Sequence, residues 1–176
     1  AGCTSNSLTT SLSDPAAPAA PTATSPPAYC DGEAILDITA TGVGSATFAW
    51  YSDAALTTLV DSDATFTPSG AVGTQTVYVV QTVAGCASPA TQVDITVNVT
   101  PTAPTATSPA AYCDGDTVND ITATGVGSAT FTWYSDAALT TVVDSDATFT
   151  PAGTIGTETV YVTQTLGSCE SSATQV

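Results

Sequence analysis

The sequence contains no lysine, arginine, histidine or methionine, whereas it has 16 aspartate and glutamate residues and a formal net charge of −16. Without cationic side chains the chain cannot neutralise phosphate groups, which excludes nucleic acid and anionic membrane surfaces as primary partners. The absence of histidine and lysine also removes the usual general bases and Schiff-base nucleophiles. Carboxylates, hydroxyl groups and cysteine are the reactive groups that remain. We predict no enzyme activity and no catalytic residue, with calcium as the one cofactor candidate.

Long apolar runs and dense charge are also missing. No run of about 18 apolar residues occurs, so we expect no membrane insertion. Charged residues make up 9% of the chain against 43% hydrophobic residues, which is unlike a disordered acidic tail. Threonine and valine are abundant, and this composition favours β structure.

An internal repeat with a period of 83 residues organises the chain. Residues 27–93 match residues 110–176 at 50 of 67 positions without a gap. Internal repeats of this kind indicate an array of similar modules. Because positions of every kind are equally well kept, identity between the two copies does not mark functional residues.

The repeat predicts three parts. Residues 1–17 would be the tail strand of a preceding repeat, residues 18–100 a first module, and residues 101–176 a second module that lacks its last strand. Eight of the 11 prolines lie in residues 15–27 and 101–109, which we predict to be extended, semi-rigid linkers. We interpret the chain as a window on a longer array.

Each copy is predicted to be an all-β sandwich of about seven short strands. The alternation is clearest in residues 47–51, where Phe48 and Trp50 share one face. Turns are expected where glycine and proline cluster. In the first copy the expected strands are residues 21–25, 34–41, 47–51, 57–60, 64–67, 74–82 and 91–99.

Four of the five cysteines repeat with the modules. Cys30 and Cys86 are 56 residues apart, and so are Cys113 and Cys169. We predict one structural disulfide within each module, which implies an oxidising, extracellular location. A zinc site is disfavoured because the sequence has no C-x-x-C pair and no histidine. Cys3 is left unpaired in this part of the chain.

A longer pattern runs through both copies: Tyr-Cys-x-Gly, Ala-Thr-Gly, Trp-Tyr, Gly-Thr-x-Thr-Val-Tyr-Val and a late cysteine. It resembles the immunoglobulin-like modules of very large secreted and cell-surface proteins of Bacteroidota. The resemblance implies a surface or secreted array associated with adhesion or gliding, and it supplies no active site. In the first copy the pattern is carried by Tyr29, Cys30, Gly32, Ala40, Thr41, Gly42, Trp50, Tyr51, residues 73–79, Gln81, Thr82 and Cys86.

Short acidic turns are the candidate metal sites. Two aspartates that flank a serine offer carboxylate oxygens of the kind that bind Ca²⁺, although such residues more often cap and solvate a turn. A second acidic pair near the start of each module is a candidate of the same kind. The first set is Asp61, Asp63, Asp144 and Asp146, and the second is Asp31, Glu33, Asp114 and Asp116.

Trp50 and Trp133 have two interpretations. Each could stack on a sugar ring, or each could fill the core of its sandwich. Their alternation with Phe48 and Phe131 favours the core.

The first functional hypothesis is a non-catalytic structural repeat of an extracellular adhesin, stalk or filament. It would assemble head to tail with adjoining repeats or other copies of itself. The alternative is a calcium- or carbohydrate-dependent binding module of a secreted protein, with surface glycans as its ligands. A third hypothesis is an accessory segment of a secreted enzyme.

The second copy lacks the counterpart of residues 94–99, which predicts an open sheet edge beside a hydrophobic groove. We expect a strand in register to fill this edge, supplied by continuing chain or by strand addition from a neighbouring copy. Residues 7–14 align with this strand, with Leu12 at the place of Ile95.

Overall fold

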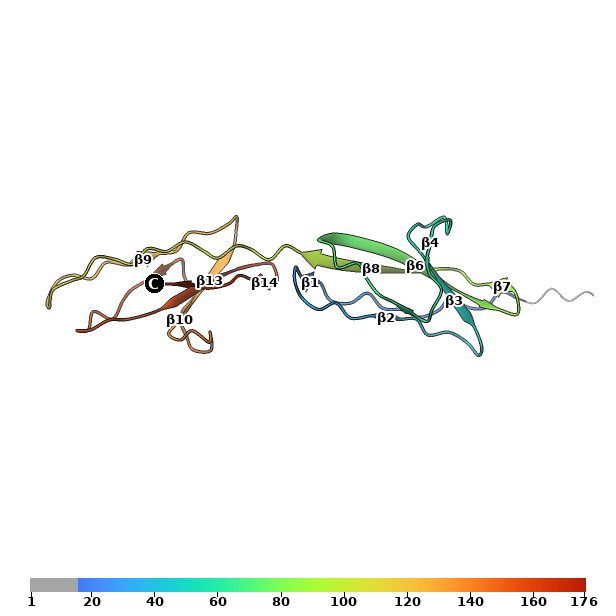
Figure 1. The fold of residues 1–176 in the computed structure, drawn as a ribbon, viewed down its shortest axis with the longest axis horizontal. Helices are drawn as coiled ribbons and strands as arrows, with labels where there is room; N and C mark the ends of the chain where they lie inside the picture. The colour runs from blue at the N-terminus through green and yellow to red at the C-terminus, as the bar shows by residue number, and fades with distance from the viewer. Residues whose placement is uncertain (1–15) are drawn as a thin grey trace, which may run out of the picture. The chain divides into compact units, whose positions relative to one another are not determined.

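The structure is a computed structural model that describes residues 16–176 (Figure 1). All regular secondary structure in this range is β-strand, so the predicted all-β class is confirmed. Cys3 and residues 7–14, to which the sequence assigned an unpaired thiol and a strand, lie outside the described residues. Residues 16–176 include no helix with the length and apolar character needed to cross a membrane.

The described chain forms two compact units. The first contains residues 16–26, Leu36–Pro68 and Thr76–Asp94, and the second contains Pro27–Ile35, Ser69–Gln75 and Ile95–Val176. The division runs through the first repeat, because strands β6 (Gly73–Val83) and β8 (Thr91–Asn98) contribute residues to both units. The predicted module boundary between residues 100 and 101 stays a prediction.

The larger sheet of the first repeat has the strand order β1-β8-β6-β3-β4, and β7 also pairs with β6 (Figure 1). Strand β1 runs parallel to β8, whereas β3 is antiparallel to both β4 and β6. The second layer is the antiparallel pair β2 and β5. The bounds are Tyr29–Cys30 for β1, Ile38–Thr39 for β2, Thr47–Tyr51 for β3, Leu59–Asp61 for β4, Thr65–Phe66 for β5 and Cys86–Ala87 for β7.

The core of the first unit lies between these two layers. Trp50 in β3 is fully buried and stacks on Phe66 of β5, with ring centroids 5.3 Å apart. Val77, Val79 and Val93 are also completely buried. Each such side chain contributes about 1.5–3 kcal/mol by leaving water. Side-chain ion pairs do not add to this stability, because the chain has no lysine, arginine or histidine.

The second repeat is built in the same way within the second unit. One sheet has the order β11-β10-β13-β14 with β15 also on β13, and β9 pairs with β12 in the other layer. Trp133 stacks on Phe149, again at 5.3 Å. The bounds are Ile121–Thr122 for β9, Thr130–Tyr134 for β10, Val142–Asp144 for β11, Thr148–Phe149 for β12, Tyr161–Leu166 for β13, Cys169–Glu170 for β14 and Thr174–Gln175 for β15.

The proline-rich segments are docked on the sandwiches. The buried Gln81 donates from Nε2 to the carbonyl oxygen of Ala19 at 2.7 Å and accepts from the amide of Val43 at 2.9 Å. Gln164 donates in the same way to the carbonyl oxygen of Thr102. These segments were predicted as extended, semi-rigid linkers. At Ala19 and Thr102 their backbone is in addition bound by a buried glutamine of the sheet.

Candidate functional site

A disulfide joins a cysteine of the first repeat to a cysteine of the second. Cys30 in β1 is bonded to Cys169 in β14, 139 residues further along the chain, with Cα atoms 5.6 Å apart. Both cysteines belong to the second compact unit. Closing a loop of this length contributes about 5 kcal/mol in the chain-entropy model, because the bond restricts the unfolded chain.

The predicted pairs Cys30–Cys86 and Cys113–Cys169 are therefore wrong. In the first repeat Cys86 of β7 lies opposite Val83, the last residue of β6, in the antiparallel sheet. Cys30 instead lies opposite Asn98, the last residue of β8.

The last residue of β6 and the last residue of β8 lie far apart along the sheet. The hydroxyl groups of Thr74 and Thr96 lie 3.2 Å apart, and Thr76 donates to Asp94 at 2.7 Å, so the end of β8 adjoins the start of β6. Strand β6 has 11 residues, which at about 3.3 Å per residue separates its ends by about 30 Å. A disulfide requires Cα atoms within about 7 Å. The equal spacing of the two predicted cysteine pairs along the sequence therefore does not mean that the paired cysteines lie close together in the fold.

Cys113 lies in a backbone turn of the second repeat that is equivalent to the turn at Cys30 in the first. The carbonyl oxygens of Cys30 and Cys113 accept from the amides of Glu33 and Asp116, each at 3.0 Å. The carboxylates of Glu33 and Asp116 accept in return from the two cysteine amides at 2.8 Å. These carboxylates, proposed above as calcium ligands, thus cap their own turn. Cys113 is exposed and has no disulfide partner within residues 16–176.

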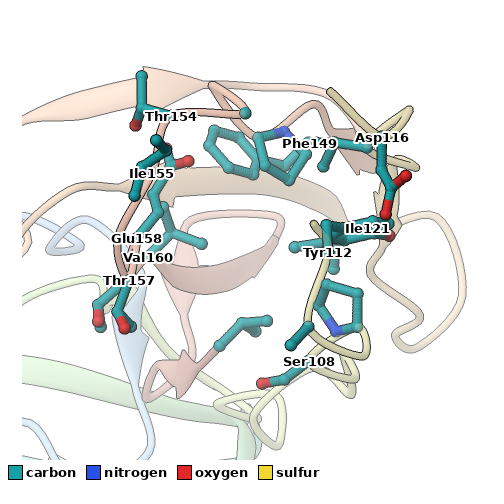
Figure 2. A pocket seen from close by; sticks show the side chains of 18 of the residues that line it. Ser108, Tyr112, Asp116, Ile121, Phe149, Thr154, Ile155, Thr157, Glu158 and Val160 are labelled. Atoms are coloured by element: carbon teal, nitrogen blue, oxygen red, sulfur yellow. The ribbon is translucent and has the colours of Figure 1, made fainter. Parts of the chain in front are cut away.

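A groove with a volume of about 600 Å³ opens on the second repeat. Figure 2 shows Ile155, Thr157 and Glu158 on one side and Ser108 and Tyr112 on the other. Its apolar lining includes core residues of the second sandwich, namely Ile121, Phe149 and Val160. Beside them the side chain of Ile155 is 87% exposed, the largest exposure of a large apolar residue among those described.

The acidic turns between short strands are capped rather than open. Asp61 Oδ1 accepts from the amides of Ser62 and Asp63 at 2.6 and 3.0 Å. The carbonyl oxygen of Asp63 accepts from Trp50 Nε1 at 3.0 Å, which ties the turn to the core. Asp144 and Asp146 repeat this arrangement. Across the described part of the chain, no three acidic or cysteine side chains are grouped so that they could hold a metal ion.

Two further aspartates have a structural role that the sequence analysis missed. Asp53 accepts from the amides of Thr57 and Thr58, and the first of these hydrogen bonds is the main cause of its lowered pKa. At the equivalent Asp136 desolvation is the largest single influence and raises the pKa, but hydrogen bonds from the two equivalent amides outweigh it. A signal was present in the sequence, because aspartate is favoured at the first position of a turn, where its side chain can accept from nearby backbone amides.

The second repeat also carries a polar cluster of its own. Tyr134 donates to Glu170 Oε1 at 3.1 Å, and Thr163 donates to the same oxygen at 2.6 Å. Burial raises the pKa of Tyr134, and the hydrogen bond to Glu170 and the charge of its carboxylate act in the same direction. The first repeat has Val80 and Ala87 at the positions of Thr163 and Glu170, so this cluster is specific to one copy.

The two tryptophans are core residues. Trp50 and Trp133 have no exposed surface, so neither presents a ring face to a sugar. The interpretation of these residues as core is confirmed, and the stacking platform is wrong.

The pattern in the two repeats also matches a known family. A profile described as "Ig-like domain CHU_C associated" matches residues 18–99 and again residues 101–176. The chain belongs to this family. The resemblance seen in the sequence is thereby confirmed, since this domain type is associated with Bacteroidota. Immunoglobulin-like domains of this family are generally structural or binding modules rather than catalytic ones.

Among solved structures, the Ig-like chain is similar to murine CEACAM1b, with 12% identity over 87% of this chain and 96% of that one, and a TM-score of 0.43. It is also similar to the FN1–FN3 domains of chicken CNTN1, with 10% identity and a TM-score of 0.44. A structure that addresses Dscam isoform specificity matches with 13% identity and a TM-score of 0.32. The match to CNTN1 covers 91% of this chain and 64% of that chain. The match to the Dscam structure covers 88% of this chain and 44% of that chain. No curated protein matches the chain significantly.

Proposed function

We propose that the chain is a structural repeat of an extracellular adhesin, stalk or filament whose modules follow one another head to tail. The observation that carries this proposal is the Cys30–Cys169 disulfide. The bond connects consecutive repeats, so pulling them apart requires breaking a covalent bond in addition to unfolding. The peptide between the repeats lies inside the closed loop, so a single backbone cut there leaves the two parts connected.

The same bond supports the proposed location. Disulfides form and persist in oxidising, extracytoplasmic compartments. The absence of lysine and arginine fits this setting as well, because trypsin-like proteases have no cleavage site in the chain.

The calcium- or carbohydrate-dependent alternative lacks a supporting contact. The candidate aspartates accept hydrogen bonds from their own turns, and both tryptophans are buried. We therefore favour a mechanical role over recognition of a small ligand.

The proposal can be tested by labelling cells that produce the protein with an antibody against it, before and after permeabilisation. We expect full labelling of intact cells, with an abundant cytoplasmic protein stained only after permeabilisation as the control. Labelling of the protein only in permeabilised cells would contradict the proposal.

A further inference from the structure

The polar cluster of the second repeat lies on the outer face of its sheet. Strand β13 lies between β10 and β14 in this sheet (Figure 1). The hydroxyl groups of Tyr134 in β10 and Thr163 in β13 both donate to Oε1 of Glu170 in β14. These side chains point away from the core, because the neighbouring Trp133 and Val162 are completely buried on the opposite face of the same two strands.

The carboxylate of Glu170 is held in place, but no cation of the chain pairs with it. Two hydroxyl donors on one oxygen fix its position, and within residues 16–176 no group donates to Oε2. Thr163 and Tyr134 are 0% and 9% exposed, whereas Glu170 is exposed. The sequence has no lysine, arginine or histidine. A cationic side chain that pairs with this carboxylate therefore has to belong to another protein.

Glu170 differs in this respect from the carboxylates of the turns. Asp53, Asp61 and Asp144 accept hydrogen bonds from backbone amides of their own turns, so their role is local. Both donors to Glu170 are side chains of other strands, and the pairing of β14 with β13 is formed without them. The cluster thus positions a charge on the surface without capping any turn.

An aromatic ring lies near this charge. Tyr161 is directly opposite Tyr134 in the pairing of β10 with β13, and it points to the same face as Thr163. Residues two apart on a strand are separated by about 7 Å. Tyr161 is partly exposed. A planar guanidinium can stack on a tyrosine ring while it donates to a carboxylate, whereas an ammonium group is a compact, strongly hydrated charge. The pair of groups therefore suits arginine.

We propose that Glu170 and Tyr161 form a binding site for an arginine side chain of a partner protein. The guanidinium donates to Glu170 Oε2 and stacks on the ring of Tyr161, while Tyr134 and Thr163 hold the carboxylate in position. Preorganisation of this kind raises affinity, because less side-chain entropy is lost on binding. The site goes beyond the proposed function and does not rest on it, since a module of any role could carry it.

The first repeat is an internal control. It has the same pair of tyrosines, Tyr51 and Tyr78, directly opposite each other in β3 and β6. Ala87 stands where Glu170 does, and Val80 replaces the threonine donor. The aromatic ring is thus present without the carboxylate, and we expect arginine to bind at the second repeat alone.

The first test is an NMR titration of the whole chain with a capped Gly-Arg-Gly peptide. Sodium chloride at about 150 mM screens the diffuse attraction between the peptide and the acidic chain. We expect saturable shifts of the amides of Tyr161 and Glu170 and none at their counterparts, Tyr78 and Ala87. A peptide with citrulline, which has the shape of arginine without its charge, should bind at least about tenfold more weakly. A peptide with lysine should bind at least about threefold more weakly.

Two variants test the residues. Glu170→Gln keeps an oxygen that can accept from Tyr134 and Thr163 but removes the charge, and it should weaken binding of the arginine peptide at least about tenfold. Val80→Thr combined with Ala87→Glu transfers the cluster to the first repeat. This second variant should add saturable shifts at Tyr78, and a gain of binding cannot arise from a loss of folding.

Several results would overturn the proposal. Binding of the citrulline or lysine peptide as tight as that of the arginine peptide would do so, as would unchanged binding by Glu170→Gln. The absence of new shifts at Tyr78 after the transfer would also overturn it. Tighter binding of Ca²⁺ than of the arginine peptide at Glu170 would assign the carboxylate to a metal ion instead.

Discussion

Removing the Cys30–Cys169 bond should change how far the chain extends under force. While the bond is intact, its two Cα atoms stay 5.6 Å apart whatever happens to the residues between them. When the bond is absent, the 139 residues from one cysteine to the other can stretch to about 3.3–3.6 Å each. The fully unfolded chain should therefore lengthen by roughly 450–500 Å.

Optical tweezers with thiol-independent tags at both chain ends measure this difference. The wild-type protein without reductant is compared with a Cys30→Ser variant after complete unfolding of each. Cys113→Ser is the matched control, because it removes a cysteine from the equivalent turn without touching the bond, and it should leave the length unchanged.

Disulfides within each module would give a different result. Each would close a segment of 56 residues, so Cys30→Ser and Cys113→Ser would each add only roughly 190 Å. An increment of that size for both variants, or no increment for Cys30→Ser, would refute the reasoning.

Three other predictions concern stability. The folded-state pKa of Asp53 is lowered below the unfolded value of 3.8. Its ionised carboxylate therefore adds to the free energy of unfolding above pH 3.8, and this stabilisation is lost as the pH falls through the folded-state pKa. Urea unfolding between pH 7 and pH 2 should therefore show a smaller acid-induced loss for Asp53→Asn than for wild type, and an unchanged loss would contradict the hydrogen-bond assignment. Gly125→Ala should destabilise the second repeat by about 1–3 kcal/mol, because its Cβ would lie 2.0 Å from Gln164 Oε1. Urea unfolding of Gly125→Ala with and without Gln164→Ala tests this, since the glycine substitution should cost less once the amide is gone, and an equal cost in both backgrounds would contradict it. Raising sodium chloride from about 10 to about 150 mM should increase the melting temperature by screening carboxylate repulsion, and a decrease would show that this repulsion does not limit stability.

The strands with clear alternation could be predicted from the sequence. Residues 47–51 were predicted and observed with identical bounds. The predicted strand over residues 74–82 is one residue shorter than β6 at each end, and the one over residues 91–99 extends one residue beyond β8. In β8 the buried side chains follow the period of two, whereas in β6 the consecutive residues Val79, Val80 and Gln81 are all buried. The expected strand over residues 34–41 shrinks to Ile38–Thr39. Ile38 and Ala40 are buried in this segment, whereas Leu36 is 71% exposed.

The disulfide and the capped turns could not be derived in the same way. Cysteine spacing counts residues along the chain, whereas the bond depends on which strand ends meet after folding. Strand β7, which positions Cys86, has two residues and therefore no readable period. The docking of the proline-rich segments was missed for a related reason, because Gln81 binds Ala19 across 62 residues of sequence.

Disulfide mapping of the protein isolated from producing cells tests the central claim most directly, namely that consecutive repeats are covalently bridged. The protein is alkylated, digested without reduction by a protease that cuts after aspartate and glutamate, and analysed by mass spectrometry. We predict a linked pair of peptides, one with Cys30 and the other with Cys169, that separates on reduction. Peptides linked through Cys30 and Cys86, or through Cys113 and Cys169, would contradict the account.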